Sequence, residues 1–158
     1  MKVKGILFED FVNYKKISMT IMMPKCSFKC DKECGRQVCQ NSKLASAPSI
    51  EIDDSEIVNM YLENPLTEAI VFQGLEPFDS WEDLARLIDT FRTYTHDDIV
   101  IYTGYTKEEL EKTCYLQFLK KYDKIIIKYG RYLPNNQKKF DKVLNVWLAS
   151  DNQYAEEL

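Results

Sequence analysis

The sequence predicts a single α/β domain over residues 1–158, built around a mostly parallel sheet. Short apolar runs that end at Gly or Pro alternate along the chain with stretches of helical spacing. The connections are long enough for the right-handed crossovers that parallel strands require. The chain has 158 residues, which suits one domain, and 45% of them are hydrophobic, which is enough to bury a core.

Five apolar segments predict the strands: residues 17–23, 68–72, 98–102, 124–128 and 143–148. In a parallel sheet, ligands gather at the carboxyl ends of the strands. Four segments follow predicted strands: the cysteine segment after Pro24, Gly74–Pro77, Thr103–Tyr105 and Ser150–Gln153. We therefore expect these segments to converge on one rim of the sheet.

Helices are predicted between the strands. A first helix is predicted to begin at the capping residues Asp53 to Ser55 and to run to about Leu62. Asp79 and Ser80 are predicted to cap a second helix. In the second helix Trp81, Leu84, Leu87, Ile88 and Phe91 recur at helical spacing. Thr106, followed by Glu108 and Glu109, begins a third helix, whereas residues 40–50 have the composition of a loop.

Charge and hydropathy narrow the classes of function. The formal net charge is −4 and the sequence pI is about 5.1, which argues against broad, phosphate-driven binding of nucleic acid. Charged residues recur within the first ten residues, so no apolar stretch of signal-peptide length forms there. No window approaches the roughly 18 apolar residues of a membrane span. We expect a soluble, cytoplasmic protein without a membrane partner.

Four of the five cysteines, Cys26, Cys30, Cys34 and Cys39, lie within one 14-residue span. In a reducing cytoplasm, clustered thiols bind a metal or carry out redox chemistry. A structural zinc site usually has two close pairs separated by a dozen or more residues, so this spacing favours a [4Fe–4S] cluster over zinc or over redox and structural thiols. If only three thiolates bind such a cluster, one iron stays open to a ligand from outside the protein.

Six stretches in order along the chain carry a resemblance to a known family. They are Glu9–Asn13, Cys26-x3-Cys30, Cys39-Gln40-Asn41, Gln73-Gly74-Leu75-Glu76-Pro77, Ile101–Tyr105 and Leu148–Gln153. With them the sequence resembles the radical S-adenosylmethionine activases, and within these the activating proteins of anaerobic (class III) ribonucleoside-triphosphate reductases. The family signature is Cys-x3-Cys-x2-Cys, and here an insertion containing Cys34 separates Cys30 from Cys39.

The resemblance implies a fold, a cofactor pair and a set of site residues. The fold would be an incomplete, TIM-like α/β barrel with mostly parallel strands, since the chain is too short for eight strand–helix units. The cofactors would be a [4Fe–4S] cluster and S-adenosylmethionine. Glu76 would accept a hydrogen bond from the methionine ammonium, and Gly74 would allow close approach of the backbone. Thr103, Gly104 and Asn152 would make further contacts to the ligand.

The resemblance also implies an activity and partners. One electron through the cluster would cleave S-adenosylmethionine and give a 5′-deoxyadenosyl radical that activates a glycyl-radical enzyme, best matched by anaerobic ribonucleotide reductase. An electron donor such as flavodoxin or ferredoxin would supply the electron. Two alternatives stay open: a radical enzyme acting on a metabolite or peptide, and a non-catalytic iron–sulfur or zinc protein in electron transfer or assembly. The third cluster ligand is also open, with Cys39 favoured over Cys34.

Overall fold

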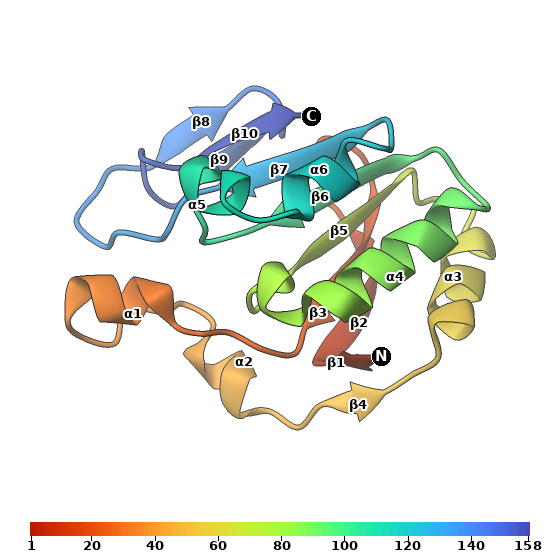
Figure 1. Ribbon diagram of the computed structural model, residues 1–158, viewed down its shortest axis with the longest axis horizontal. Coiled ribbons are helices and arrows are strands. Elements are labelled where there is room, and N and C mark those ends of the chain that lie inside the picture. The colour runs from red at the N-terminus through yellow and green to blue at the C-terminus, as the bar shows by residue number, and fades with distance from the viewer.

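The computed structural model describes all residues 1–158 and has a six-stranded central sheet flanked by helices (Figure 1). The strand order is β10-β7-β6-β5-β3-β2. The four inner strands are parallel to one another, and both edge strands are antiparallel to their neighbours. The fold is therefore α/β with a mostly parallel sheet. The sheet has two edges and does not close, and the incomplete TIM-like barrel stays a prediction.

The central sheet contains β2 (Gly5–Asp10), β3 (Ser18–Met23), β5 (Ala69–Gly74), β6 (Asp98–Tyr102), β7 (Ile125–Tyr129) and β10 (Tyr154–Glu157). Two small antiparallel pairs stand outside it: β1 (Lys2–Val3) with β4 (Ile50–Glu51), and β8 (Lys139–Asp141) with β9 (Val146–Leu148). The helices are α1 (Lys29–Cys34), α2 (Ser42–Ser46), α3 (Asp54–Leu62), α4 (Trp81–Arg92), α5 (Lys107–Glu111) and α6 (Tyr115–Leu119), with a 3₁₀ turn at Pro77–Ser80.

The four predicted parallel strands are confirmed. The apolar runs that predicted them form β3, β5, β6 and β7; the bounds of β6 are as predicted, and those of the other three differ by one or two residues. These strands are buried on both faces, which explains why their sequences are continuous apolar runs rather than alternating patterns. Their carboxyl ends lie together at one end of the sheet, because consecutive strands pair in parallel register.

The prediction of a last strand over residues 143–148 is wrong in its extent and its pairing. Only Val146–Leu148 is extended, and this strand, β9, pairs with β8 in a separate hairpin. The Asp141 side chain accepts hydrogen bonds from the backbone N–H groups of Val143 and Leu144, which bends the chain there into a turn. The last strand of the central sheet is β10, which pairs with β7.

The three predicted helices are confirmed as α3, α4 and α5. Thr106 and Glu109 form a capping box at the start of α5, the reciprocal bonding that the Thr-x-x-Glu spacing favours. The loop predicted over residues 40–50 contains helix α2 and begins strand β4, so that expectation is wrong in part. Figure 1 shows α1 and α2 beyond one end of the sheet, away from α3 and α4.

Two apolar clusters cover the two faces of the sheet. The larger lies between the sheet and helices α3 to α6 and includes Phe72, Leu84, Phe91 and Leu119. The smaller joins Val71, Val100 and Ile126 to Tyr14 and Leu148, beneath the β8–β9 hairpin. No helix of the structure has the length and apolar character needed to cross a membrane.

Candidate functional site

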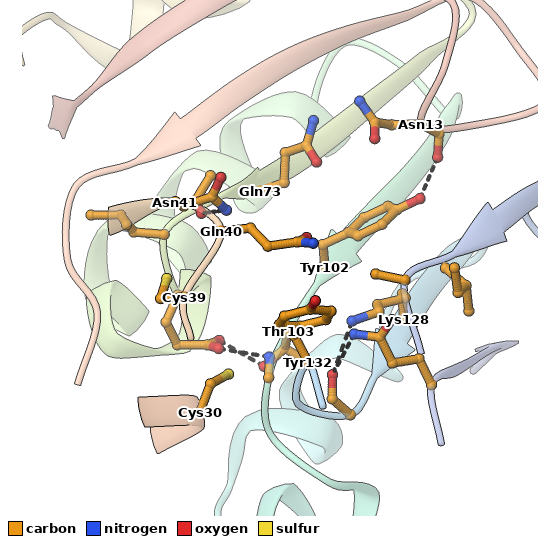
Figure 2. A pocket seen from close by; sticks show the side chains of 18 of the residues that line it. Asn13, Cys30, Cys39, Gln40, Asn41, Gln73, Tyr102, Thr103, Lys128 and Tyr132 are labelled. Carbon is orange, nitrogen blue, oxygen red and sulfur yellow. Dashed lines mark hydrogen bonds between the residues drawn. The ribbon is translucent and has the colours of Figure 1, made fainter. Parts of the chain in front are cut away.

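A cavity of about 350 Å³ opens at the carboxyl ends of β5, β6 and β7. Three of the four clustered cysteines line it: Cys26, Cys30 and Cys39. Cys34 does not line it and is half-buried elsewhere. Figure 2 shows Cys30 and Cys39 on one side of this cavity, with Lys128 on the other.

The insertion between Cys30 and Cys39 folds so that Cys39 returns to the cavity. Residues 29–34 form helix α1, which ends at Gly35 in the left-handed conformation with φ of +63°. The Asp31 carboxylate then accepts hydrogen bonds of 2.8 Å from the backbone N–H groups of both Val38 and Cys39. These bonds tie the chain at Cys39 to the helix that carries Cys30.

The residue two positions after Cys39 ties the cysteine segment to the sheet. The Asn41 side chain donates a hydrogen bond to the backbone carbonyl of Gly74, at the end of β5 (Figure 2). Gly74 has φ of +86°, and an added β-carbon would lie 3.1 Å from both Leu44 Cδ2 and Met22 Cβ. Only glycine allows this turn and this close approach without strain.

Burial raises the pKa of two of the cavity thiols, Cys26 and Cys30. It raises the pKa of Cys26 to about 11, against the effect of the Phe28 N–H, which donates to Cys26 Sγ at 3.3 Å. Burial also raises the pKa of Cys30, and the charge of Cys39 acts in the same direction on both thiols. Iron binds the thiolate form, so metal binding at these cysteines releases protons.

Glu76 is the central carboxylate of the cavity and is 7% exposed. Its Oε1 accepts hydrogen bonds from Thr103 Oγ1 at 2.7 Å and Phe78 N at 3.2 Å, and its Oε2 accepts from Gly104 N at 2.8 Å. Burial raises the pKa of Glu76 to about 7, although these three bonds favour the charged form. Thr103 and Gly104 line the cavity and also hold this carboxylate in place.

Lys128, at the end of β7, is a cavity residue to which sequence reasoning gave no role. It is 7% exposed, and its Nζ donates to the backbone carbonyl of Gly130 at 3.0 Å. Burial lowers the pKa of Lys128 to about 8, despite the opposing charge of Glu76. The signal in the sequence is a lysine that directly follows the buried run Ile125 to Ile127 at a strand end.

Asn152 does not line the cavity. It is exposed, and its Nδ2 donates to the carbonyl of Arg131 at 2.9 Å. Its neighbour Gln153 does line the cavity and donates to the carbonyl of Gly130 at 3.1 Å. The Ser150–Gln153 segment therefore reaches the rim as expected, although it follows the β8–β9 hairpin rather than a strand of the central sheet.

The three thiols do not form a site for a single metal ion. No group of three or more His, Cys, Asp or Glu side chains stands close enough together to hold one ion. In a cubane cluster each thiolate binds a different iron, so its ligands stand farther apart than those of one zinc ion. Three thiols along the wall of a cavity fit a cubane cluster in chemistry and can bind three of its four irons.

A family model described as "4Fe-4S single cluster domain" matches residues 15–155, which is most of the chain. This chain belongs to the 4Fe-4S single cluster domain family. The matched residues of this 4Fe–4S domain run from before β3 to within β10, so they include all four clustered cysteines and all of the cavity lining except Val12 and Asn13. No curated protein and no solved structure matches the chain.

The cofactor prediction of a [4Fe–4S] cluster is thus confirmed at the level of the family, whereas zinc is not supported. Of the residues that the sequence predicted, the structure brings Cys26, Cys30 and Cys39 together with Gly74, Glu76, Thr103 and Gly104 around one cavity. It places Cys34 and Asn152 outside that cavity.

Proposed function

We propose that this 4Fe–4S domain binds S-adenosylmethionine at an open iron and generates a 5′-deoxyadenosyl radical that activates a glycyl-radical enzyme. The observation that carries the proposal is the cavity itself. Its wall holds three thiols, while the fourth clustered cysteine, Cys34, lies outside. Three protein ligands leave one iron of a cubane free for a ligand from outside the protein.

Two charged side chains that line the cavity, Glu76 and Lys128, suit the methionine end of S-adenosylmethionine. The Glu76 carboxylate would accept from the ammonium group, and the Lys128 ammonium would donate to the carboxylate. Both side chains are more than nine-tenths buried, so each would gain from a charged partner in a site of low dielectric. Thr103 and Gly104 would keep Glu76 oriented by the bonds that they already make.

The cofactors supply the chemistry: one electron from the reduced cluster cleaves a sulfonium C–S bond of S-adenosylmethionine to give methionine and the radical. The protein binds and orients the ligand. Its buried walls, including Leu75 and Leu148, limit the access of water to the cavity. A small electron donor such as flavodoxin or ferredoxin would reduce the cluster.

The rim of the cavity favours a macromolecular partner over a small metabolite. Val12 and Trp147 line the mouth, yet they are 72% and 67% exposed. Phe140 packs against Trp147 with ring centroids 5.6 Å apart and is also exposed, although it lies outside the cavity lining. Apolar surface of this kind, next to a site, suits contact with a protein. The glycyl-radical enzyme that we propose is anaerobic ribonucleotide reductase.

The test is the release of 5′-deoxyadenosine from S-adenosylmethionine by the anaerobically reconstituted protein with a chemical reductant. We expect product with the wild-type protein and with Cys34→Ser. Replacing Glu76 by Gln removes a charged hydrogen bond of about 1.5 to 3 kcal/mol, so the rate at low S-adenosylmethionine should fall about ten- to a hundredfold. A reconstituted wild-type protein that releases neither 5′-deoxyadenosine nor methionine would leave the second candidate, a non-catalytic electron carrier.

A further inference from the structure

Helix α1 carries Cys30 but has little hold on the rest of the molecule. None of its six residues is buried, and an isolated helix of this length is not stable in water. Residues in the left-handed conformation flank it at both ends, Phe28 with φ of +53° and Gly35 with φ of +63°. Hydrophobic packing therefore does not fix the position of this helix.

Two charged residues, one helical turn apart, connect α1 to the body of the protein. Lys29 Nζ lies 3.4 Å from Glu109 Oε1 and 3.7 Å from the centroid of the Tyr105 ring. Glu33 Oε2 lies 3.1 Å from Arg131 Nε, as an ion pair without a hydrogen bond. Residues four apart on a helix share a face, so this face of α1 meets the body of the protein.

The partners of these two residues are bonded to each other. Arg131 Nη2 donates to Glu109 Oε1 at 2.6 Å, and the Arg131 side chain is only 12% exposed. Although burial acts in the opposite direction, the bond from Arg131 lowers the pKa of Glu109 to about 2. Lys29, Glu109, Arg131 and Glu33 thus form a chain of alternating charges, which we call the α1 clamp.

The clamp lies beside the thiol that α1 carries. An added β-carbon at Gly104 would lie 3.7 Å from Cys30 Sγ and 3.8 Å from Arg131 Cγ, so both side chains reach the same glycine. Arg131 also acts electrostatically on the Cys30 thiol. A shift of α1 along the clamp would move Cys30 relative to Gly104 and the cavity.

We infer that the α1 clamp positions Cys30 as a cluster ligand, and that it acts by charge. The inference rests on Cys30 being a ligand of the cluster in the proposed site, and it makes Lys29, Glu33, Glu109 and Arg131 positioning residues. Breaking the clamp should loosen one corner of the cluster while the fold stays intact.

The test compares the rate of iron release to an excess of chelator from the anaerobically reconstituted full chain. In the double variant, Glu33→Gln and Glu109→Gln remove both acids of the clamp. Gln at 109 still satisfies the capping box with Thr106, so helix α5 keeps its start. Partly exposed ion pairs are individually weak, so we expect iron release from the double variant to be about tenfold faster than from the wild type. Unfolding of the cluster-free protein should change little.

Glu156→Gln is the matched control. It breaks the Lys107–Glu156 ion pair, which has an N–O distance of 2.7 Å and an exposure similar to that of the Lys29–Glu109 pair, but does not touch α1. We expect this variant to release iron at the wild-type rate. Wild-type release from the double variant would overturn the inference. The Cys30→Ser variant distinguishes failure of the clamp from failure of the proposed site. A full complement of iron in this variant would show that Cys30 is not a ligand at all.

Salt tests the same point without substitution, should the double variant fail to fold. The Debye length falls to about 3 Å at 1 M salt, so salt weakens the more exposed ion pairs, among them Lys29–Glu109 of the clamp. Iron release from the wild type and from Glu156→Gln should accelerate several-fold between about 0.05 and 1 M sodium chloride. Release from a folded double variant should not respond. A wild-type rate that is independent of salt would contradict a clamp made of charges.

Discussion

Asp31 is the residue that decides how the cysteine segment closes. Its carboxylate accepts hydrogen bonds from the N–H groups of Val38 and Cys39, and so brings Cys39 back to helix α1, which contains Cys30. Cys34 lies on that helix but not in the cavity. Sequence spacing left Cys34 and Cys39 as alternatives, because it does not report which way a carboxylate in an insertion folds the chain.

The structure predicts different outcomes for the two cysteines. Cys39→Ser should lose most of the cluster, because it removes one of three thiolates in the cavity. Cys34→Ser should keep iron and acid-labile sulfide at the wild-type level, as should Cys114→Ser, an exposed cysteine far along the chain. Iron and sulfide per chain after anaerobic reconstitution measure this. The reverse result, with loss in Cys34→Ser alone, would make Cys34 the third ligand.

Glu76 gives a prediction on pH. Burial raises its folded pKa from the ordinary 4.5 to about 7, so between these values the folded protein binds a proton that the unfolded chain does not. The free energy of unfolding of the cluster-free protein should therefore fall as pH rises through this window, by about 3 kcal/mol from this group.

The Glu76→Gln variant isolates that effect, because Gln does not titrate. Chemical denaturation at a series of pH values gives the difference in unfolding free energy between wild type and variant. This difference should change by about 3 kcal/mol across the window, with the wild type becoming less stable relative to the variant as the pH rises. A difference that stays constant with pH would mean that Glu76 is not strained by burial.

At the scale of elements, the strand ends of the parallel sheet position the site, and the turn after β5 is tightly constrained. Gly74 combines a left-handed φ of +86° with contacts that leave no room for a side chain. Two other glycines separate these effects. Gly35 has a φ of +63° but open space around it, and Gly5 has neither a left-handed φ nor a close neighbour.

The loss of unfolding free energy on substitution by alanine should be largest at Gly74, smaller at Gly35 and smallest at Gly5. Gly35→Ala should lose about 1 kcal/mol of unfolding free energy from backbone strain, and Gly74→Ala about 2 kcal/mol or more, since it adds a forced contact to the same strain. Gly5→Ala should stay within about 0.5 kcal/mol of the wild type. Chemical denaturation measures all three. Equal losses at positions 35 and 74 would show that the turn after β5 can adjust.

At the scale of the whole molecule, the sequence predicted the parts of the fold that periodic patterns encode. The four inner strands and the helices between them are apolar runs and amphipathic stretches, so their ends and their shared rim could be predicted. The antiparallel edges could not, because β2 and β10 are mixed in polarity, and β8–β9 depends on a turn formed by Asp141.

The site divides in the same way. Cys26, Cys30, Glu76 and Gly74 stand in recognisable motifs, so the sequence could assign them. Lys128 is significant only because the fold buries it in the cavity that Glu76 also lines, and the α1 clamp exists only once Glu109 and Arg131 meet in space. Such pairings are long-range contacts that no local pattern carries.

The central claim is a [4Fe–4S] cluster with one iron that the protein leaves open for S-adenosylmethionine. Electron paramagnetic resonance of the anaerobically reconstituted, reduced protein, recorded with and without S-adenosylmethionine, tests it most directly. We predict a signal of a reduced [4Fe–4S] cluster whose g-values shift when S-adenosylmethionine is added. An identical spectrum with and without the ligand would contradict the open iron and, with it, the radical function.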